Sequence, residues 1–223
     1  MLDRVDIDEK WFYITRVKQR YFVAPGEKPP PRKCKHKKHL IKVMFLTAMA
    51  RPRVDQQTGV WWDGKIGTWC FAEQVPAQRN SINRPAGTLE TKTINVTWEV
   101  TVHYYINHLF PAIEAKWPAW DSPRKVRIQQ DNATPHPPPG KDAGINAALA
   151  GMATRGWDVA LVEQPPNSPD CNTLDLAFFQ AIQSIQHKMS SNNIDELIFN
   201  VITAHNDLPW DLCQKVWTTV QWL

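Results

Sequence analysis

The sequence has few of the features that mark secreted, membrane-spanning or zinc-binding proteins. Only four of its 223 residues are cysteine, and they form no CxxC pair and no Cys/His cluster at the spacing of zinc ligands. The N-terminus has no apolar signal segment, and the longest apolar run, Leu40 to Ala50, contains Lys42 and is too short to span a bilayer. We therefore expect free thiols in a reducing compartment and no membrane segment.

The sequence also has no strong excess of one charge. Its 26 Lys and Arg residues against 22 Asp and Glu residues give a net charge of only +4, so a polyanionic partner is not required by the overall charge. A hydrophobic content of 43% is ordinary and is sufficient for one domain with one substantial core. The eleven tryptophans are expected mostly in the core, and the adjacent Trp61 and Trp62 must place their rings on opposite faces of a strand.

Hydrophobic patterning predicts strands in the first half and alternating strands and helices afterwards. Such an order is typical of an α/β layer fold, in which helices cover a mixed sheet. The stretch EQPPNSPDCN is expected to be irregular because its prolines remove backbone donors. The predicted strands are Leu2–Ile7, Tyr21–Ala24, His39–Ala50, two strands joined by a hairpin turn at Asp63-Gly64, Lys125–Gln130 and Asp158–Val162. The predicted helices are Thr97–Trp117 with a kink at Pro111, Ala143–Thr154, Thr173–Lys188 capped by Asn172, one capped by Asn193, and one that begins at Pro209.

Three aspartates lie where a strand or loop ends against apolar neighbours. They are Asp8 in IDEKWF, Asp131 in QQDNATPH and Asp175 in NTLDLAFF. Carboxylates from separate elements can hold one or two Mg²⁺ ions against a phosphate, and two ions can stabilise both the attacking and the leaving oxygen of an in-line displacement. If Asn172 caps its helix, Asp175 occupies the third helical position, where the helix dipole favours an ionised acid. An acid at that position can also do no more than bond the backbone of the cap.

Six segments occur in an order that is itself informative. They are IDEKWF, KVMFLTAMARPR, WDGKIG, NRPAGTLETK, QQDNATPH and QPPNSPDCNTLDLAFFQAIQ, and together they cover nearly the whole chain. In this order they resemble the catalytic domain of mariner-like DDE/D transposases, especially the plant-type branch. The resemblance implies an α/β, RNase H-like (retroviral-integrase-like) fold for residues 1–223. It also implies a metal-dependent DNA endonuclease and strand transferase that uses two Mg²⁺ or Mn²⁺ ions.

The family's catalytic and metal-binding acids match Asp8, Asp131 and Asp175. Asp170 competes for the third position, but the family pattern and the helix-start argument both favour Asp175. His136 falls on the histidine of the family's DNAxxH motif, where contact with the substrate or with a metal ligand is implied; a structural histidine with satisfied hydrogen bonds is the alternative. Asp6 departs from the family, which has a histidine there. Strand alternation aims Asp6 to the side of Asp8, where its charge is expected to raise the proton affinity of the acids or distort metal binding.

A basic stretch lies between Pro31 and Lys38, where five of eight residues are Lys or Arg. We predict that this stretch contacts DNA phosphates without base specificity or acts as a nuclear localisation signal, with a solvated loop as the alternative. The resemblance implies a nuclear protein that binds double-stranded DNA, both transposon terminal inverted repeats and target DNA, as a homodimer. The residues predicted to contact DNA are Arg32, Lys33, Lys35, Lys37, Lys38 and His136.

Three functions remain open at the level of the sequence. Members of the family carry a helix-turn-helix DNA-binding region before the catalytic domain, whereas Met1 lies only seven residues before Asp8. We therefore expect an excised fragment, a decayed copy or a domain reused by its host. The leading hypothesis is an active transposase domain. The alternatives are a non-catalytic nuclear DNA-binding or interaction protein and a structure-selective nuclease that cleaves DNA without strand transfer.

Overall fold

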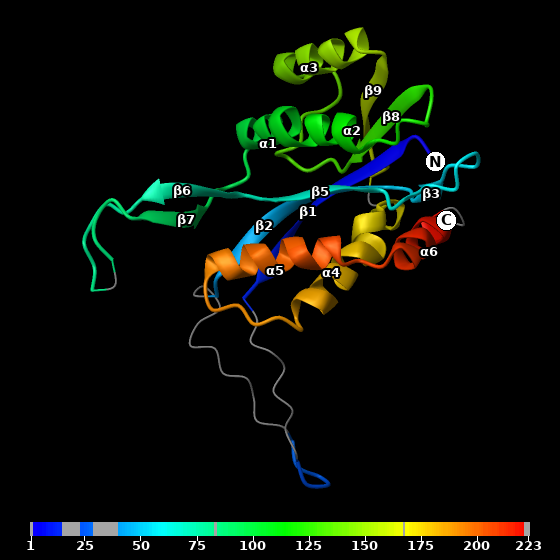
Figure 1. Cartoon of the computed structure of the whole chain (residues 1–223). Helices are drawn as coiled ribbons and strands as arrows, with labels where there is room; N and C mark the ends of the chain where they lie inside the picture. The colour runs from blue at the N-terminus through cyan, green and yellow to red at the C-terminus, as the bar shows by residue number, and fades with distance from the viewer. Residues whose placement is uncertain (1, 15–22, 29–39, 83, 167, 221–223) are drawn as a thin grey trace.

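The chain folds around a five-stranded mixed sheet that carries helices on both faces (Figure 1). The computed structural model describes residues 2–14, 23–28, 40–82, 84–166 and 168–220. The strand order is β5-β2-β1-β8-β9; β2 is antiparallel to β1 and β5, whereas β8 is parallel to β1 and β9. The predicted α/β mixed sheet flanked by helices is confirmed. The strands are β1 (Arg4–Tyr13), β2 (Lys42–Ala50), β5 (Lys65–Cys70), β8 (Arg124–Gln130) and β9 (Trp157–Glu163).

Strand β1 lies at the centre of the sheet and sets the two faces. It is longer than the predicted Leu2–Ile7 because β2 pairs with it from Val5 to Tyr13. Side chains alternate along a strand, so Val5 and Ile7 enter the hydrophobic core on one face and Phe12 enters the core on the other. Asp6 and Asp8 share the face of Phe12 by the same alternation.

One face of the sheet is covered by the helices drawn in green in Figure 1. The helix predicted from Thr97 to Trp117 forms without a break in the helical backbone. A π-helical turn divides it into two α-helical segments, and Pro111 lies in the first turn of the second segment. A proline is tolerated there because its missing N–H is not needed. The elements are α1 (Trp98–Tyr104), the π-helical η2 (Tyr105–Leu109), α2 (Phe110–Lys116) and α3 (Ala143–Thr154).

The opposite face is covered by the helices drawn from yellow to red. The helix predicted to follow Asn172 begins with a π-helical turn, and the side chain of Asn172 accepts a hydrogen bond from the Leu174 N–H at 3.0 Å. Asn193 caps its helix as predicted, accepting from the Glu196 N–H at 2.8 Å. The elements are η4 (Leu174–Phe178), α4 (Phe179–Gln186), α5 (Ile194–Asn206) and α6 (Trp210–Val220).

The predicted hairpin at Asp63-Gly64 is wrong. The strand before it, β4 (Trp61–Trp62), pairs with β3 (Arg53–Val54), whereas β5 pairs with β2. Gly64 has a φ of +77°, and its carbonyl accepts from the Ala50 N–H at 2.7 Å, so the turn leads the chain from the small ribbon into the main sheet. The rings of Trp61 and Trp62 pack on different partners, Trp210 and Trp117 respectively.

The remaining elements lie outside the central sheet. A hairpin of β6 (Ala72–Pro76) and β7 (Leu89–Thr93) extends away from the body (Figure 1). The stretch expected to be irregular contains a short 3-10 helix, η3 (Pro169–Cys171). Val23 and Ala24 are not in a strand, and the rest of the strand predicted there lies outside the described residues, as does the basic stretch 31–38. No helix in the described part of the chain is long and apolar enough to cross a membrane. The three described cysteines, Cys70, Cys171 and Cys213, are free, as predicted.

Candidate active site

Asp8, Asp131 and Asp175 line one open pocket of about 420 Å³. Asp8 lies within β1, Asp131 directly follows β8, and Asp175 lies in the first turn of η4. The parallel register pairs Asp6 with Gln129, so both strands lead two residues later to an aspartate. Asp170 is not among the described residues that line this pocket. The structure thus brings together the three acids that the sequence singled out and favours Asp175 over Asp170.

Amide side chains join the elements around the pocket. Asn132 donates to the Gln164 carbonyl at 3.0 Å, and the Gln164 N–H donates to the Gln130 carbonyl at 2.8 Å. Asn172 donates to the Ile7 carbonyl at 3.1 Å and so fixes the start of η4 against β1. None of the described lining residues is Lys or Arg. The pocket is therefore polar and acidic.

Asp8 is the most deeply buried of the three acids. Burial, followed by the negative charges of Asp175, Glu9 and Asp131, raises the pKa of Asp8 to about 8, although the Glu9 N–H donates to its carboxylate at 2.7 Å. Several carboxylates in one partly buried pocket repel one another. A divalent cation among them would offset that repulsion.

Asp131 is held by its own loop. Its Oδ1 accepts from the Ala133 N–H at 3.0 Å and lies 2.5 Å from Nδ1 of His136. The hydrogen bond from His136 is the main reason that the pKa of Asp131 is lowered. Burial opposes a charge on His136, but hydrogen bonds to Asp131 and Glu9 outweigh burial and raise the pKa of His136 to about 10. His136 thus lies behind the pocket, with only 4% of its side chain exposed.

Glu9 is a site residue that the sequence analysis did not single out. It follows Asp8 in β1, and its Oε2 lies 2.9 Å from Nε2 of His136. Its side chain is 8% exposed. The acidic pair in the DEKWF motif was the available signal, but no sequence pattern joins Glu9 to a histidine far along the chain.

Asp6 does not add free charge to the pocket as the sequence had led us to expect. Its carboxylate forms a buried ion pair with Arg4 and accepts from the backbone N–H and the hydroxyl of Thr173 at 2.9 and 2.7 Å. Asp6 is not among the causes of the shifted pKa of Asp8. It instead fixes the backbone that leads to Asp175. Arg4, two residues away on the same face of β1, was the signal for this pairing.

The donor set of the pocket fits a divalent metal ion. Among the described residues, no three His, Cys, Asp or Glu side chains are close enough to hold an ion as they stand. Mg²⁺ does not need such a cage, because it prefers oxygen ligands, keeps several waters and uses one or two carboxylates. Three carboxylates on one pocket, where burial and then mutual repulsion raise the pKa of Asp8, supply that chemistry.

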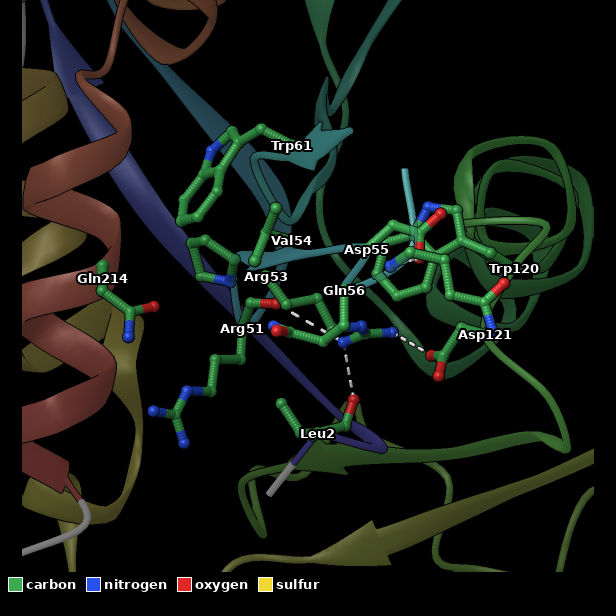
Figure 2. Close-up of a pocket in the computed structure, with 12 residues that line it drawn as sticks. Leu2, Arg51, Arg53, Val54, Asp55, Gln56, Trp61, Trp120, Asp121 and Gln214 are labelled. Carbon is green, nitrogen blue, oxygen red and sulfur yellow. Dashed lines mark hydrogen bonds and ion pairs between the residues drawn. The ribbon is translucent and has the colours of Figure 1, made fainter. Parts of the chain in front are cut away.

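A larger pocket of about 630 Å³ lies beside β3, and two of its charged residues, Arg53 and Asp121, are paired with each other (Figure 2). The guanidinium of Arg53 donates to the Leu2 carbonyl at 2.8 Å and to Asp121. It also lies over the rings of Trp62 and Trp117, at 4.5 and 4.6 Å from the ring centroids. Arg53 therefore anchors this region of the fold, and the acidic pocket remains the candidate active site.

Comparison with known proteins gives a likeness of structure only. No protein-family model matches the chain, and no curated protein matches it. It is similar to the Mos1 strand transfer complex, with 16% sequence identity and a TM-score of 0.57 over 99% of this chain and 52% of that chain. It is also similar to the Mos1 mariner paired end complex with Mn, with 17% identity and a TM-score of 0.56 over 99% of this chain and 52% of that chain. A pre-cleavage Mos1 transpososome gives 18% identity and a TM-score of 0.53 over 96% of this chain and 55% of that chain.

These structural likenesses cover only part of the matched transposase chains. This chain spans about half the length of the transposase chains that it matches. The plant-type branch stays a prediction from the sequence. The RNase H-like fold is confirmed, and it is the fold of a mariner-like transposase catalytic domain.

Proposed function

We propose that residues 1–223 are a DDE/D transposase catalytic domain in which Asp8, Asp131 and Asp175 hold divalent metal ions for DNA cleavage and strand transfer. The observation that carries the proposal is that three acids from β1, the end of β8 and η4 line one pocket. The similar Mos1 structures support the choice of ion, because one paired end complex contains Mn and another contains Mg. Two ions are the number that we propose.

Each acid has its own environment in this mechanism. When bound, the ions supply an activated water and stabilise the attacking and leaving oxygens of the phosphate. Asp8 is buried, Asp131 has one oxygen fixed by its loop, and Asp175 is exposed at the start of a helix, where the dipole favours its ionised form. After cleavage of the element's end, the freed 3′-hydroxyl attacks target DNA by direct transesterification.

The proposed partner is double-stranded DNA, as transposon terminal inverted repeats and as target DNA. One of the similar structures is a Mos1 paired-end complex with the left transposon end, which supports this class of partner. We further propose a homodimer on paired DNA ends in the nucleus. Phosphate contacts are assigned to the basic stretch that contains Arg32, Lys33, Lys35, Lys37 and Lys38.

A nicking and strand-transfer assay with Mg²⁺ or Mn²⁺ tests the proposal. The full chain is expected to nick DNA only with the metal, and Asp131→Ala is expected to lose both activities. Asp170→Ala is a matched control, because Asp170 is an aspartate close to Asp175 in sequence but is not among the described residues that line the pocket. Equal activity in Asp131→Ala and the wild type would overturn the assignment.

The second candidate is a non-catalytic nuclear protein that binds DNA or other partners. It is motivated by the departure from the family at Asp6, which stands where the family has a histidine. Salt-sensitive DNA binding without cleavage in the same assay would support this candidate. Metal-dependent nicking without strand transfer would instead favour a structure-selective nuclease.

A further inference from the structure

A buried row of three side chains connects β1 to the loop that follows β8. Glu9 lies 2.9 Å from Nε2 of His136, and the other ring nitrogen, Nδ1, lies 2.5 Å from Oδ1 of Asp131. Glu9 and His136 are 8% and 4% exposed at their side chains, whereas Asp131 is 45% exposed. The row therefore leads from the protein interior to the candidate active site.

Both ring nitrogens of His136 face a carboxylate. Nε2 and Nδ1 both lie within hydrogen-bond distance of a carboxylate oxygen, so the ring bridges Glu9 and Asp131. Glu9 lies on the strand face opposite Asp8, because neighbouring side chains in a strand alternate. His136 is thus held from β1 on one side and holds Asp131 on the other.

The two oxygens of Asp131 are not equivalent in this arrangement. Oδ1 accepts a hydrogen bond from the Ala133 N–H and also contacts Nδ1 of His136. Among the described residues, no donor is within hydrogen-bond distance of Oδ2, while Asp131 lines the acidic pocket. The side chain is therefore fixed by one oxygen and offers the other to a ligand.

The loop that carries this histidine is itself fixed. The His136 N–H donates to the Ala133 carbonyl at 2.9 Å, and Gln130 donates to the Pro137 carbonyl at 2.8 Å. Tyr105, fully buried in η2, donates to the side chain of Gln130 at 3.1 Å. Movement of the loop that carries His136 would have to break these bonds, which extend through Tyr105 into the helical layer.

We propose that His136 is a positioning residue that Glu9 holds in place and that sets the orientation of Asp131 for metal binding. The inference rests on the proposed metal site. Its role is distinct from that of the acids, because His136 acts through Asp131 and does not itself reach the pocket lining. Partners behind a metal ligand typically change metal affinity by about 10–100-fold when they are removed.

Two substitutions at one position separate the two contacts of the ring. The amide of asparagine takes the place of Nδ1, and that of glutamine takes the place of Nε2. His136→Asn therefore keeps a donor toward Asp131, whereas His136→Gln keeps only the donor toward Glu9. Mn²⁺ binding to the full chain, followed by electron paramagnetic resonance of the free ion, is expected to weaken about 10–100-fold in His136→Gln and less in His136→Asn.

The controls distinguish this inference from the proposed function. Asp131→Asn is expected to weaken Mn²⁺ binding if the metal site is correct, and unchanged binding in that variant would overturn the site and this inference together. Glu114→Gln changes a carboxylate of a surface ion pair with Arg155 and is expected to bind Mn²⁺ as the wild type does. Wild-type affinity in His136→Gln, or equal loss in both His136 variants, would overturn the positioning role alone. Thermal unfolding with a chelator checks that each variant is folded.

Nitrogen NMR of the wild-type imidazoles tests the same contact without a substitution. Saturating Mg²⁺ is expected to shift the Nδ1 resonance of His136, which faces Asp131, more than the Nε2 resonance, which faces Glu9. Unshifted resonances under saturating Mg²⁺ would overturn the proposal even if the variants do not fold.

Discussion

Replacement of Asp6 with alanine tests how the chain holds the segment that leads to Asp175. The carboxylate of Asp6 is fully buried and accepts two hydrogen bonds from Arg4 and two from Thr173. Asp6→Ala removes these acceptors and leaves the Arg4 guanidinium, only 14% exposed, without its carboxylate. Arg4 also contacts the Cys171 carbonyl and the ring of Trp217.

The expected magnitude follows from the cost of breaking a buried ion pair. Removal of one partner costs about 3–5 kcal/mol, because the other charge is left buried and unpaired. Hydrogen bonds to a charged group contribute about 1.5–3 kcal/mol each, but bonds in one network do not add. We therefore expect Asp6→Ala to lower the free energy of unfolding by about 3–5 kcal/mol. Asp6→Asn should lose less, since its amide oxygen still accepts.

Urea unfolding followed by tryptophan fluorescence measures this loss. Asp158→Ala is the matched control, because Asp158 also pairs with an arginine, Arg127, but its side chain is 64% exposed. A surface pair of this kind contributes little, so the control is expected to unfold as the wild type does. Equal stability of Asp6→Ala and Asp158→Ala would contradict the expected cost of leaving the charge of Arg4 buried and unpaired. An intermediate loss in Asp6→Asn would show that the acceptor, and not only the charge, is needed.

Three further predictions concern stability. Burial lowers the pKa of His205 to about 4, below its usual value near 6.5, so protonation favours the unfolded chain and stability should fall as the pH drops from about 6.5 to 4. The loss of stability is at most about 3 kcal/mol and should be smaller in His205→Gln. Parallel pH profiles of stability for the wild type and this variant would contradict the prediction. Gly64→Ala should be more destabilising than Gly87→Ala: both have positive φ, but a Cβ at Gly64 would lie 2.1 Å from the Ala50 carbonyl oxygen, whereas one at Gly87 meets nothing within 4 Å. Equal losses in thermal unfolding would argue against that close contact. Arg53→Lys should lower the unfolding free energy in urea by about 2 kcal/mol, because lysine cannot cover two tryptophan rings and donate in two directions as arginine does; wild-type stability would contradict this.

Features that depend on local sequence were predicted well. The Asn193 cap is set by residues within one turn, and the faces of β1 follow from strand alternation. The Asp63-Gly64 hairpin failed because a turn pair does not specify which strand pairs with the next, and β5 finds a better-buried neighbour in β2. The π-helical turns also left no signal in the hydrophobic period.

Predictions at the candidate site divide in the same way. The motifs indicated the three acids, and Asp131 and Asp175 lie at the boundary of an element as expected, whereas Asp8 lies within β1 because β2 extends the pairing of that strand to Tyr13. The supporting contacts join residues distant in sequence. Glu9 meets His136 across 127 positions, and Asp6 meets Thr173 across 167. Only the folded chain brings such partners together, so periodicity and propensity contain no information on them.

A Mn²⁺ titration of the full chain tests directly whether the three acids bind metal. The full chain is compared with Asp8→Asn, Asp131→Asn and Asp175→Asn, and with Asp170→Asn as the control that does not line the pocket. We expect weaker Mn²⁺ binding in each of the first three variants and wild-type binding in the control. Unchanged binding in those three variants, or an equal loss in Asp170→Asn, would contradict it.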